Sequence, residues 1–240
     1  MARAPRSKQL CAYCGLRIAD TEDHVIARQF FPAKQIYRGN LPKVPACAKC
    51  NSAKQRVEHG PGVIFQFGHS SDASRTLLLT QVSRRLQKNK RLHRSLRRAL
   101  GEVIVKLPSG LLIPSLAITL SPRELADMWA WFHYVAQGLY YFELRTILPA
   151  DHTIHLVKPT TFEQFVIFRD LITRDSKRQT REHASGEIRY AFTRNDEEQL
   201  TMWLLAFKSI EMFWLTAGPV SRASVGPLLA NVEWTKPERD

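Results

Sequence analysis

The chain has 240 residues, of which 44% are hydrophobic and 24% charged, and its formal net charge at pH 7 is +13. This length and apolar content are enough to bury a core in one domain or two. No apolar run approaches the roughly 18 residues that a bilayer-spanning helix needs, which argues against a membrane protein. The first residues are basic with no apolar run behind them, so no signal peptide is evident. We therefore expect a cytoplasmic protein.

The positive charge is concentrated in the first part of the sequence. Residues 1–60 carry 11 Lys and Arg against 4 Asp and Glu, residues 61–101 carry 9 against 1, and residues 102–240 carry 15 against 17. A local excess of cations favours a polyanionic partner, through phosphate contacts and the release of counterions. A generally basic protein would spread its charge more evenly. We expect the partner to be a nucleic acid.

Residues 1–9 are predicted to form a flexible basic arm, after which the chain's four cysteines occur in two Cys-x-x-Cys pairs. Two such pairs about thirty residues apart can bind one tetrahedral Zn²⁺, because each pair offers two thiolates from a tight turn. Disulfides or redox chemistry are the alternatives, but paired cysteines in a reducing compartment more often bind zinc. Few large apolar residues lie between the pairs, so the unit at residues 10–60 is expected to depend on its metal. The predicted ligands of the structural zinc are Cys11, Cys14, Cys47 and Cys50.

Residues 61–101 are predicted to form a basic helical connector. From position 73 to 100 the sequence has no acidic residue, glycine or proline, a composition that favours helix. Leucines recur at four-residue steps on either side of Asn89 but not on one face, which indicates two helices or one bent helix. Its cations form either a solvated face or a surface that follows a phosphate backbone, and the lack of acidic partners favours the second. The residues expected to bind nucleic acid are Arg84, Arg85, Lys88, Arg91 and Arg94, together with Lys54 from the zinc unit.

A C-terminal α+β domain is predicted at residues 102–217, with an irregular tail at 218–240. Ser121-Pro122-Arg123-Glu124 is a strong helix start, for a helix that reaches about Leu144. All five tryptophans lie from position 129 onwards, so the main core is expected here. The domain carries no recognisable motif, and substrate selection, homodimer formation and docking of a protein partner are its open roles. The other predicted elements are strands at 102–107, 111–120, 152–157, 187–193 and within 200–215, and a helix at 161–172.

The cysteine pairs enclose an acid–histidine pair and an asparagine, and Asn51 and Lys54 follow the last cysteine. In order and spacing, residues 11–54 resemble the zinc-knuckle variety of the HNH endonuclease family. The resemblance implies a ββα-metal unit, in which two antiparallel strands joined by a long loop and a following helix hold one divalent metal. It also implies that His24 is the general base and that Asp23 and Asn51 bind the metal. Asn40 would fix the loop.

Phosphodiester hydrolysis calls for residues of these types. A histidine with a pKa near its ordinary value of about 6.5 can deprotonate water at neutral pH. A cation offsets the charge that develops on the phosphoryl oxygens, and a carboxylate with a carboxamide suits Mg²⁺ or Mn²⁺ better than Zn²⁺. Adjacent residues on a strand face opposite ways, so Asp23 and His24 can act together only where the strand ends.

The sequence thus predicts an α+β protein with an N-terminal zinc-stabilised ββα-metal nuclease unit, a basic helical connector and a C-terminal α+β domain. Its predicted activity is that of an Mg²⁺- or Mn²⁺-dependent HNH endonuclease acting on DNA. The alternative is a non-catalytic zinc ribbon that binds nucleic acid beside a partner.

Overall fold

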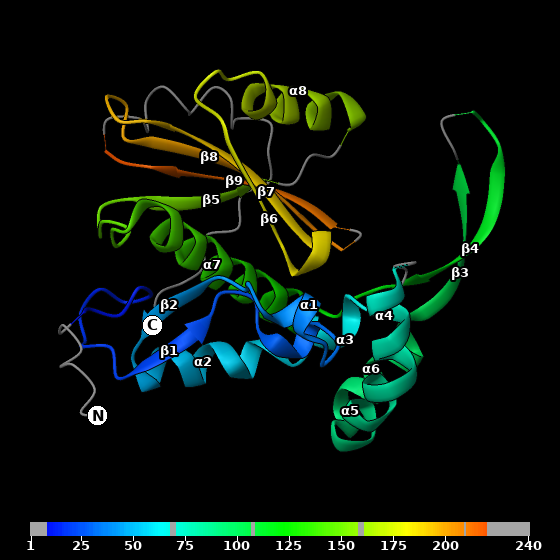
Figure 1. Ribbon diagram of the computed structural model, residues 1–240. Helices are drawn as coiled ribbons and strands as arrows, with labels where there is room; N and C mark the ends of the chain where they lie inside the picture. The colour runs from blue at the N-terminus through cyan, green and yellow to red at the C-terminus, as the bar shows by residue number, and fades with distance from the viewer. Residues whose placement is uncertain (1–8, 68–70, 107–108, 158–160, 209, 220–240) are drawn as a thin grey trace.

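The computed structural model describes residues 9–67, 71–106, 109–157, 161–208 and 210–219 of the chain (Figure 1). Helices and antiparallel strands build these residues into an α+β fold, which confirms the predicted class. The predicted basic arm and the predicted tail lie almost wholly outside the described residues. None of the helices in the described part is long and apolar enough to cross a bilayer.

The N-terminal unit has the order strand, loop, strand, helix. Strands β1 (Thr21–His24) and β2 (Lys43–Ala46) pair antiparallel, with His24 opposite Lys43 at the end of the ladder. Helix α2 (Ala48–Glu58) begins directly after β2, with Cys47 as its N-cap. The loop between the strands contains the short helices η1 (Arg28–Phe30) and α1 (Gln35–Arg38).

A string of short helices follows and ends in a two-stranded hairpin. Asn89 (φ −108°, ψ 73°) interrupts the helical path, and its side chain accepts a hydrogen bond from the Leu92 N–H at the next helix start. The helix break predicted near this residue is therefore present. The elements are α3 (Pro61–Ile64), α4 (Asp72–Leu77), η2 (Leu78–Val82), α5 (Ser83–Lys88), α6 (Lys90–Ala99), β3 (Leu100–Lys106) and β4 (Leu112–Ile118).

The C-terminal part is a five-stranded antiparallel sheet between two helices. Helix α7 (Pro122–Leu144) begins with the predicted capping box of Ser121 and Glu124 and covers one face, while α8 (Phe162–Thr173) covers the other (Figure 1). The strand order is β5-β9-β8-β7-β6. The strands are β5 (Thr153–Val157), β6 (Gln179–His183), β7 (Ile188–Asn195), β8 (Leu200–Phe207) and β9 (Ile210–Ala217), with the short η3 (Ala184–Gly186) between β6 and β7.

One hydrophobic core joins the cysteine-bearing N-terminal unit to the C-terminal sheet. Helix α7 lies between them (Figure 1), and a buried cluster runs through all three. Phe30 stacks on Trp131 of α7 at a ring distance of 5.1 Å and meets Phe207 of β8 edge-on at 5.6 Å. A Cβ on Gly138 would come within 2.8 Å of Val25, so glycine permits the close approach of α7 to the residue after β1. Packing is therefore continuous across residue 60, where the sequence suggested a domain boundary.

Candidate functional site

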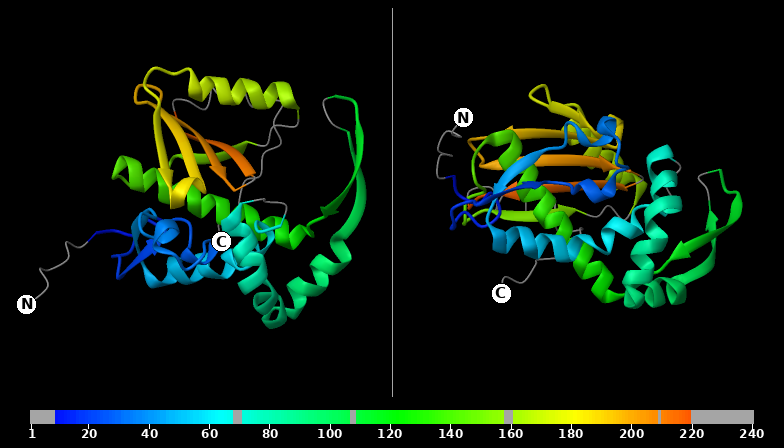
Figure 2. Two further views of the ribbon diagram at one scale, coloured as in Figure 1. Left: turned by 45° about the vertical axis from the view of Figure 1, so that its right-hand side comes forward. Right: turned by 60° about the horizontal axis from the view of Figure 1, so that its bottom comes forward.

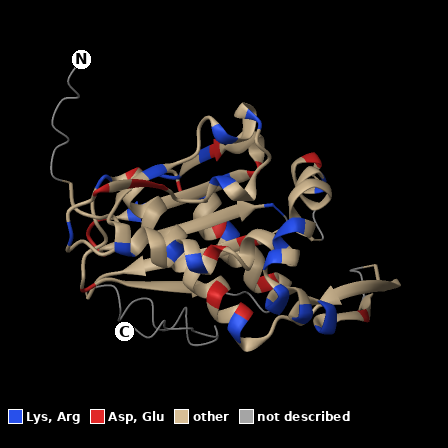
Figure 3. Ribbon diagram, turned by 90° about the horizontal axis from the view of Figure 1, so that it is seen from below, with Lys and Arg blue, Asp and Glu red and all other residues tan. Residues whose placement is uncertain are grey.

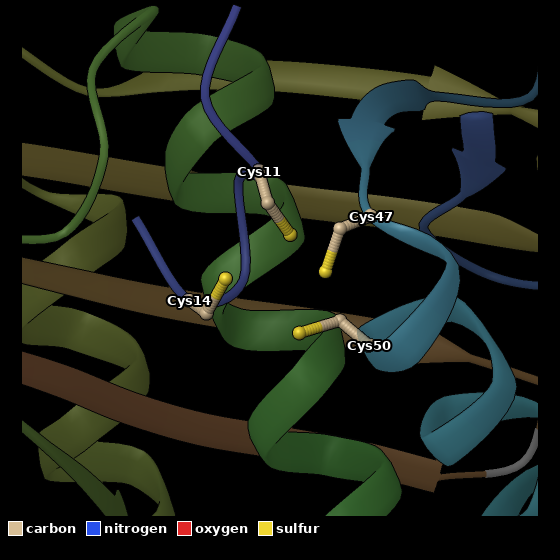
Figure 4. Close-up of side chains that lie close together, drawn as sticks. All are labelled: Cys11, Cys14, Cys47 and Cys50. Carbon is tan, nitrogen blue, oxygen red and sulfur yellow. The ribbon is translucent and has the colours of Figure 1, made fainter. Parts of the chain in front are cut away.

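The four cysteines gather at one point from two distant segments. Gly15, with a positive φ of 66°, turns the chain so that its N–H donates to the Cys11 carbonyl (2.8 Å), which brings Cys14 round to face Cys11. The second pair lies at the start of α2, where the Asn51 N–H donates to the Cys47 carbonyl (3.0 Å). All four side chains point towards one another (Figure 4), and their sulfur atoms lie within 4.8 Å of each other.

This cluster could hold a structural metal such as zinc. No disulfide joins the four thiols. Zinc–sulfur bonds of about 2.3 Å in a tetrahedron place the sulfurs about 3.8 Å apart, so a small contraction would complete the site. Burial raises the pKa of the Cys14 thiol, but hydrogen bonds from the N–H groups of Leu16 and Arg17 outweigh burial and lower that pKa to about 7. Burial instead raises the pKa of the Cys11 and Cys50 thiols, so Cys14 is the most readily deprotonated of these three thiols in the absence of the metal.

His24 ends β1 and is half-buried beside two exposed cations. Burial lowers its pKa below the ordinary value, and the positive charges of Lys43 and Arg28 lower the pKa further. The imidazole is therefore neutral at pH 7, the form that can accept a proton. Lys43 lies opposite His24 in the ladder, and Arg28 lies four residues along the loop. The HNH-like sequence pattern did not identify these two cations as neighbours of His24. The expected pairing of the two strands could have placed Lys43 next to His24.

Asp23 faces the opposite way and is buried in a polar cluster. Its Oδ2 accepts a hydrogen bond from the Tyr13 hydroxyl (2.5 Å) and lies 2.9 Å from Lys54 Nζ. Lys54 is fully buried, pairs with Glu58 at 2.6 Å and donates to the His24 carbonyl at 2.8 Å. The sequence suggested a phosphate contact for Lys54, whereas in this conformation its Nζ is buried and bound to protein groups. The side chain instead forms ion pairs with two carboxylates beneath β1.

Asn51 lies in the first turn of α2, where its amide bridges two neighbours. Nδ2 donates to the Thr21 hydroxyl at 3.2 Å, and Oδ1 accepts from Gln55 Nε2 at 3.1 Å. Asp23 and Asn51 are thus held in separate hydrogen-bond sets. The lysine at Asp23 occupies the place where a cation would bind, so these two residues do not fit Mg²⁺ or Mn²⁺ in this arrangement. Among the described residues, the four cysteines form the only cluster of three or more His, Cys, Asp or Glu with metal-binding spacing.

Asn40 ties the loop to the C-terminal sheet. Its Oδ1 accepts a hydrogen bond from the Ala184 N–H (3.0 Å), and its carbonyl accepts one from Nδ1 of His183 (2.7 Å). His183 in turn packs against Tyr190, whose hydroxyl donates to Glu143. The residue expected to fix the loop is therefore bound by a part of the chain to which the sequence assigned no role.

Most of the predicted nucleic-acid residues lie on one basic segment, and Arg85 has a different role. Figure 3 shows Lys and Arg gathered on the helices that lead to the hairpin. The Arg85 guanidinium donates to the carbonyls of Gln29 (2.8 Å) and Gly62 (3.2 Å) and to Gln81 (2.7 Å). It therefore fastens α5 to the loop after β1. The side chains that remain exposed are Arg84, Lys88, Arg91 and Arg94.

A scan of the sequence against protein-family models found no match, and searches of curated proteins and of solved structures also found none. The resemblance to HNH endonucleases therefore depends on residues 11–54 alone.

Proposed function

We propose that this protein is an endonuclease of the HNH type that hydrolyses phosphodiester bonds in DNA, with His24 as general base. The observation that carries the proposal is the position of His24. It ends the first strand of a strand–loop–strand–helix unit whose two cysteine pairs come together in one cluster. The residue is half-buried, its pKa is lowered by burial and by neighbouring cations, and its side chain lies on the side of β1 away from the Asp23–Lys54 pair.

In the proposed reaction, the neutral imidazole of His24 takes a proton from a water molecule as the water oxygen attacks phosphorus. The bond from phosphorus to the leaving oxygen breaks, and that oxygen departs with the electron pair. Arg28 and Lys43 lie close enough to His24 to affect its pKa, and they would offset the negative charge that grows on the phosphoryl oxygens. Such positioned charges and general bases each contribute substantially to phosphoryl transfer.

Two metals were expected from the sequence, and the residues present fit them differently. A zinc on the four cysteines would hold the first turn of α2 against the turn at Cys11 and Cys14. It would thereby fix the position of α2 relative to strands β1 and β2. The pair Asp23 and Asn51 does not fit a catalytic Mg²⁺ or Mn²⁺, because Lys54 neutralises Asp23 and the two side chains point to different neighbours.

DNA is the proposed substrate because exposed cations extend from the zinc unit along α5 and α6. Among the described residues of α5 and α6 there is no acidic side chain to pair with them. Cations arranged along a helix bind phosphates without regard to sequence. Arg85 links these helices to the loop that carries Arg28, so that the basic segment and the His24 site keep a fixed relation.

The test is incubation of the purified full chain with supercoiled plasmid, single-stranded DNA and RNA, with and without Mg²⁺ or Mn²⁺. Nicking of plasmid that disappears in His24→Ala supports the proposal. Asp23→Asn and Asn51→Ala are then compared over a metal titration. A shifted metal requirement in both variants would identify them as ligands despite their present contacts.

A second function is favoured by the buried Asp23–Lys54 pair. Asp23 was expected to bind a catalytic metal, but it is paired with Lys54. A zinc-stabilised module that binds nucleic acid without cutting it needs no catalytic metal, so this pairing is compatible with such a module. That module would bind the three nucleic acids without cutting any of them at any metal concentration. Binding without cleavage by a preparation with full zinc content would therefore select this alternative.

A further inference from the structure

The hairpin of β3 and β4 projects from the body of the molecule (Figure 2). Its side chains expose an unusual amount of apolar surface. Its base packs on the helical segment through Ile118, which joins the small core around Leu92 and Leu96. Beyond the base both faces are open. Eight aliphatic side chains of the hairpin are between 37% and 72% exposed: Leu100, Val103, Ile104, Val105, Leu111, Leu112, Ile113 and Leu116.

An isolated two-stranded hairpin is marginally stable in water, and exposed apolar patches of this kind mark interaction surfaces. Eight such side chains expose several hundred Å², approaching the roughly 800 Å² that each partner buries in an interface of standard size. By sequence, Glu102 and Lys106 are the only charged residues of β3 and β4, and their charges cancel. This composition does not suit nucleic acid, which the cationic helices beside it would bind. The surface suits another apolar protein surface.

The two outer edges of the hairpin differ in their hydrogen-bonding capacity. The Thr119 N–H donates to the Ala99 carbonyl (3.0 Å), so this pair is a hydrogen-bonded one. Hydrogen-bonded and non-hydrogen-bonded pairs alternate along an antiparallel ladder, so the pair Ile104–Pro114 is non-hydrogen-bonded. The nitrogen of Pro114 therefore faces the outer edge of β4, where it offers no donor. Proline at such a position protects an edge from further pairing.

The outer edge of β3 has no such protection. By the same alternation, the N–H and carbonyl groups of Glu102 and Ile104 face outwards. Among the described residues, no strand pairs with this edge. It therefore presents a row of donors and acceptors, bordered by aliphatic side chains on both faces except at Gly101 and Glu102.

We propose that the hairpin is a dimerisation arm that pairs with the same hairpin of a second copy of this chain, β3 against β3. Antiparallel pairing of one strand with its own copy is self-complementary about a two-fold axis, which closes the assembly at two chains. The resulting four-stranded sheet satisfies the open edge of β3 in both copies and leaves the proline-blocked edges of β4 outermost. Aliphatic side chains of β3 in one copy then pack against the aliphatic side chains of β3 in the other copy. This pairing is independent of the proposed nuclease activity.

The test is sedimentation velocity of the full chain without nucleic acid, at high salt, over a wide range of protein concentrations. A species of twice the chain mass of 27.5 kDa is expected, with a population that grows with concentration. Ile104→Lys should shift the chain to monomer, because it places a like charge on the paired edge of β3 in each copy. Leu79→Lys is the matched control, since Leu79 is 80% exposed but lies on η2 away from the arm, and it should leave the dimer intact.

A second pair of variants tests which edge is used. Glu102 and Leu116 face each other in one non-hydrogen-bonded pair. Glu102→Pro removes an outward donor from β3 and should abolish the dimer, while Leu116→Pro removes one from β4 and should leave a dimer. Circular dichroism and zinc content check that each variant is folded. A chain that is monomeric at every concentration, or a dimer that survives Ile104→Lys, would overturn the proposal and assign the arm to a different partner.

Discussion

Lys54 Nζ lies 2.9 Å from Oδ2 of Asp23, and this buried contact holds the Asp23 carboxylate in the interior beneath β1. The same nitrogen lies 2.6 Å from Oε1 of Glu58, so one fully buried cation forms ion pairs with two carboxylates. Burial raises the pKa of Glu58, and the charge of Lys54 acts against that rise. The acid–histidine pair thus divides between two environments, with Asp23 in the interior and His24 at the end of the strand.

Lys54→Met should destabilise the protein strongly, because it leaves two buried carboxylates without a cation. Removing one partner of a buried ion pair typically costs about 3–5 kcal/mol. The control is Lys49→Met, which removes an exposed lysine from the same helix and should change little. Urea denaturation of both variants gives the comparison. Equal stability of the two would show that Lys54 is not the cation on which Asp23 and Glu58 depend.

Removal of zinc should destabilise the whole chain. The sequence suggested that only the first sixty residues depend on the metal, but Phe30 stacks on Trp131 in a core shared with the sheet. Cys47→Ser with Cys50→Ser should therefore lower the melting temperature of a single transition and change the tryptophan fluorescence. Wild-type protein should contain one zinc per chain and recover after chelation when zinc is restored. Tryptophan fluorescence that stays unchanged when the cysteines are replaced would contradict this coupling.

Local signals in the sequence predicted local structure well. Ser121 and Glu124 form a capping box whose partners are three residues apart, and the start of α7 follows from that spacing alone. Asn89 ends one helix and caps the next for an equally local reason. The cysteine pairs predicted their own convergence, because four thiols at this spacing satisfy a single metal. The strand β6 (Gln179–His183) was missed, since its side chains are almost all exposed and show no apolar alternation.

Features that depend on distant partners could not be predicted. The burial of Lys54 requires Asp23, thirty-one residues earlier, to face inwards together with Tyr13. In the sequence, Arg85 is one of several cations in a basic run. In the structure, its guanidinium donates a hydrogen bond to the carbonyl of Gln29, 56 residues away. A run of like charges predicts a charged surface, but it does not show which of its residues will form hydrogen bonds within the protein.

The exposed cations should contribute affinity for nucleic acid, and Arg85 should contribute stability. Replacing Arg84, Lys88, Arg91 and Arg94 by Gln should weaken binding to all sequences. Each lost phosphate contact should reduce the log–log salt slope by about 0.9 for duplex DNA. Arg85→Gln should instead lower the free energy of unfolding and leave the slope nearly unchanged. Fluorescence anisotropy over a salt series measures the slopes, and an unchanged slope in the fourfold variant would place the DNA elsewhere.

The rate of cleavage should depend on pH through His24. Burial, Lys43 and Arg28 lower the pKa of this histidine below about 6.5, and only the neutral imidazole accepts a proton. The single-turnover rate should therefore be level at neutral pH and fall on acidification through a midpoint below 6.5. Lys43→Gln removes one of the cations, so it should move that midpoint to higher pH. An acid limb that does not move in this variant would assign the titration to another group.

His24→Ala in a plasmid-nicking time course tests the central claim most directly. A general base acts in the transition state and adds little to ground-state binding. The variant should lose about 10²–10⁴-fold in rate while zinc content and DNA affinity remain close to those of the wild type. His59→Ala, which removes an exposed histidine at the end of α2, should cut at the wild-type rate. Cleavage by His24→Ala at the wild-type rate would contradict the account and favour the non-catalytic binding module.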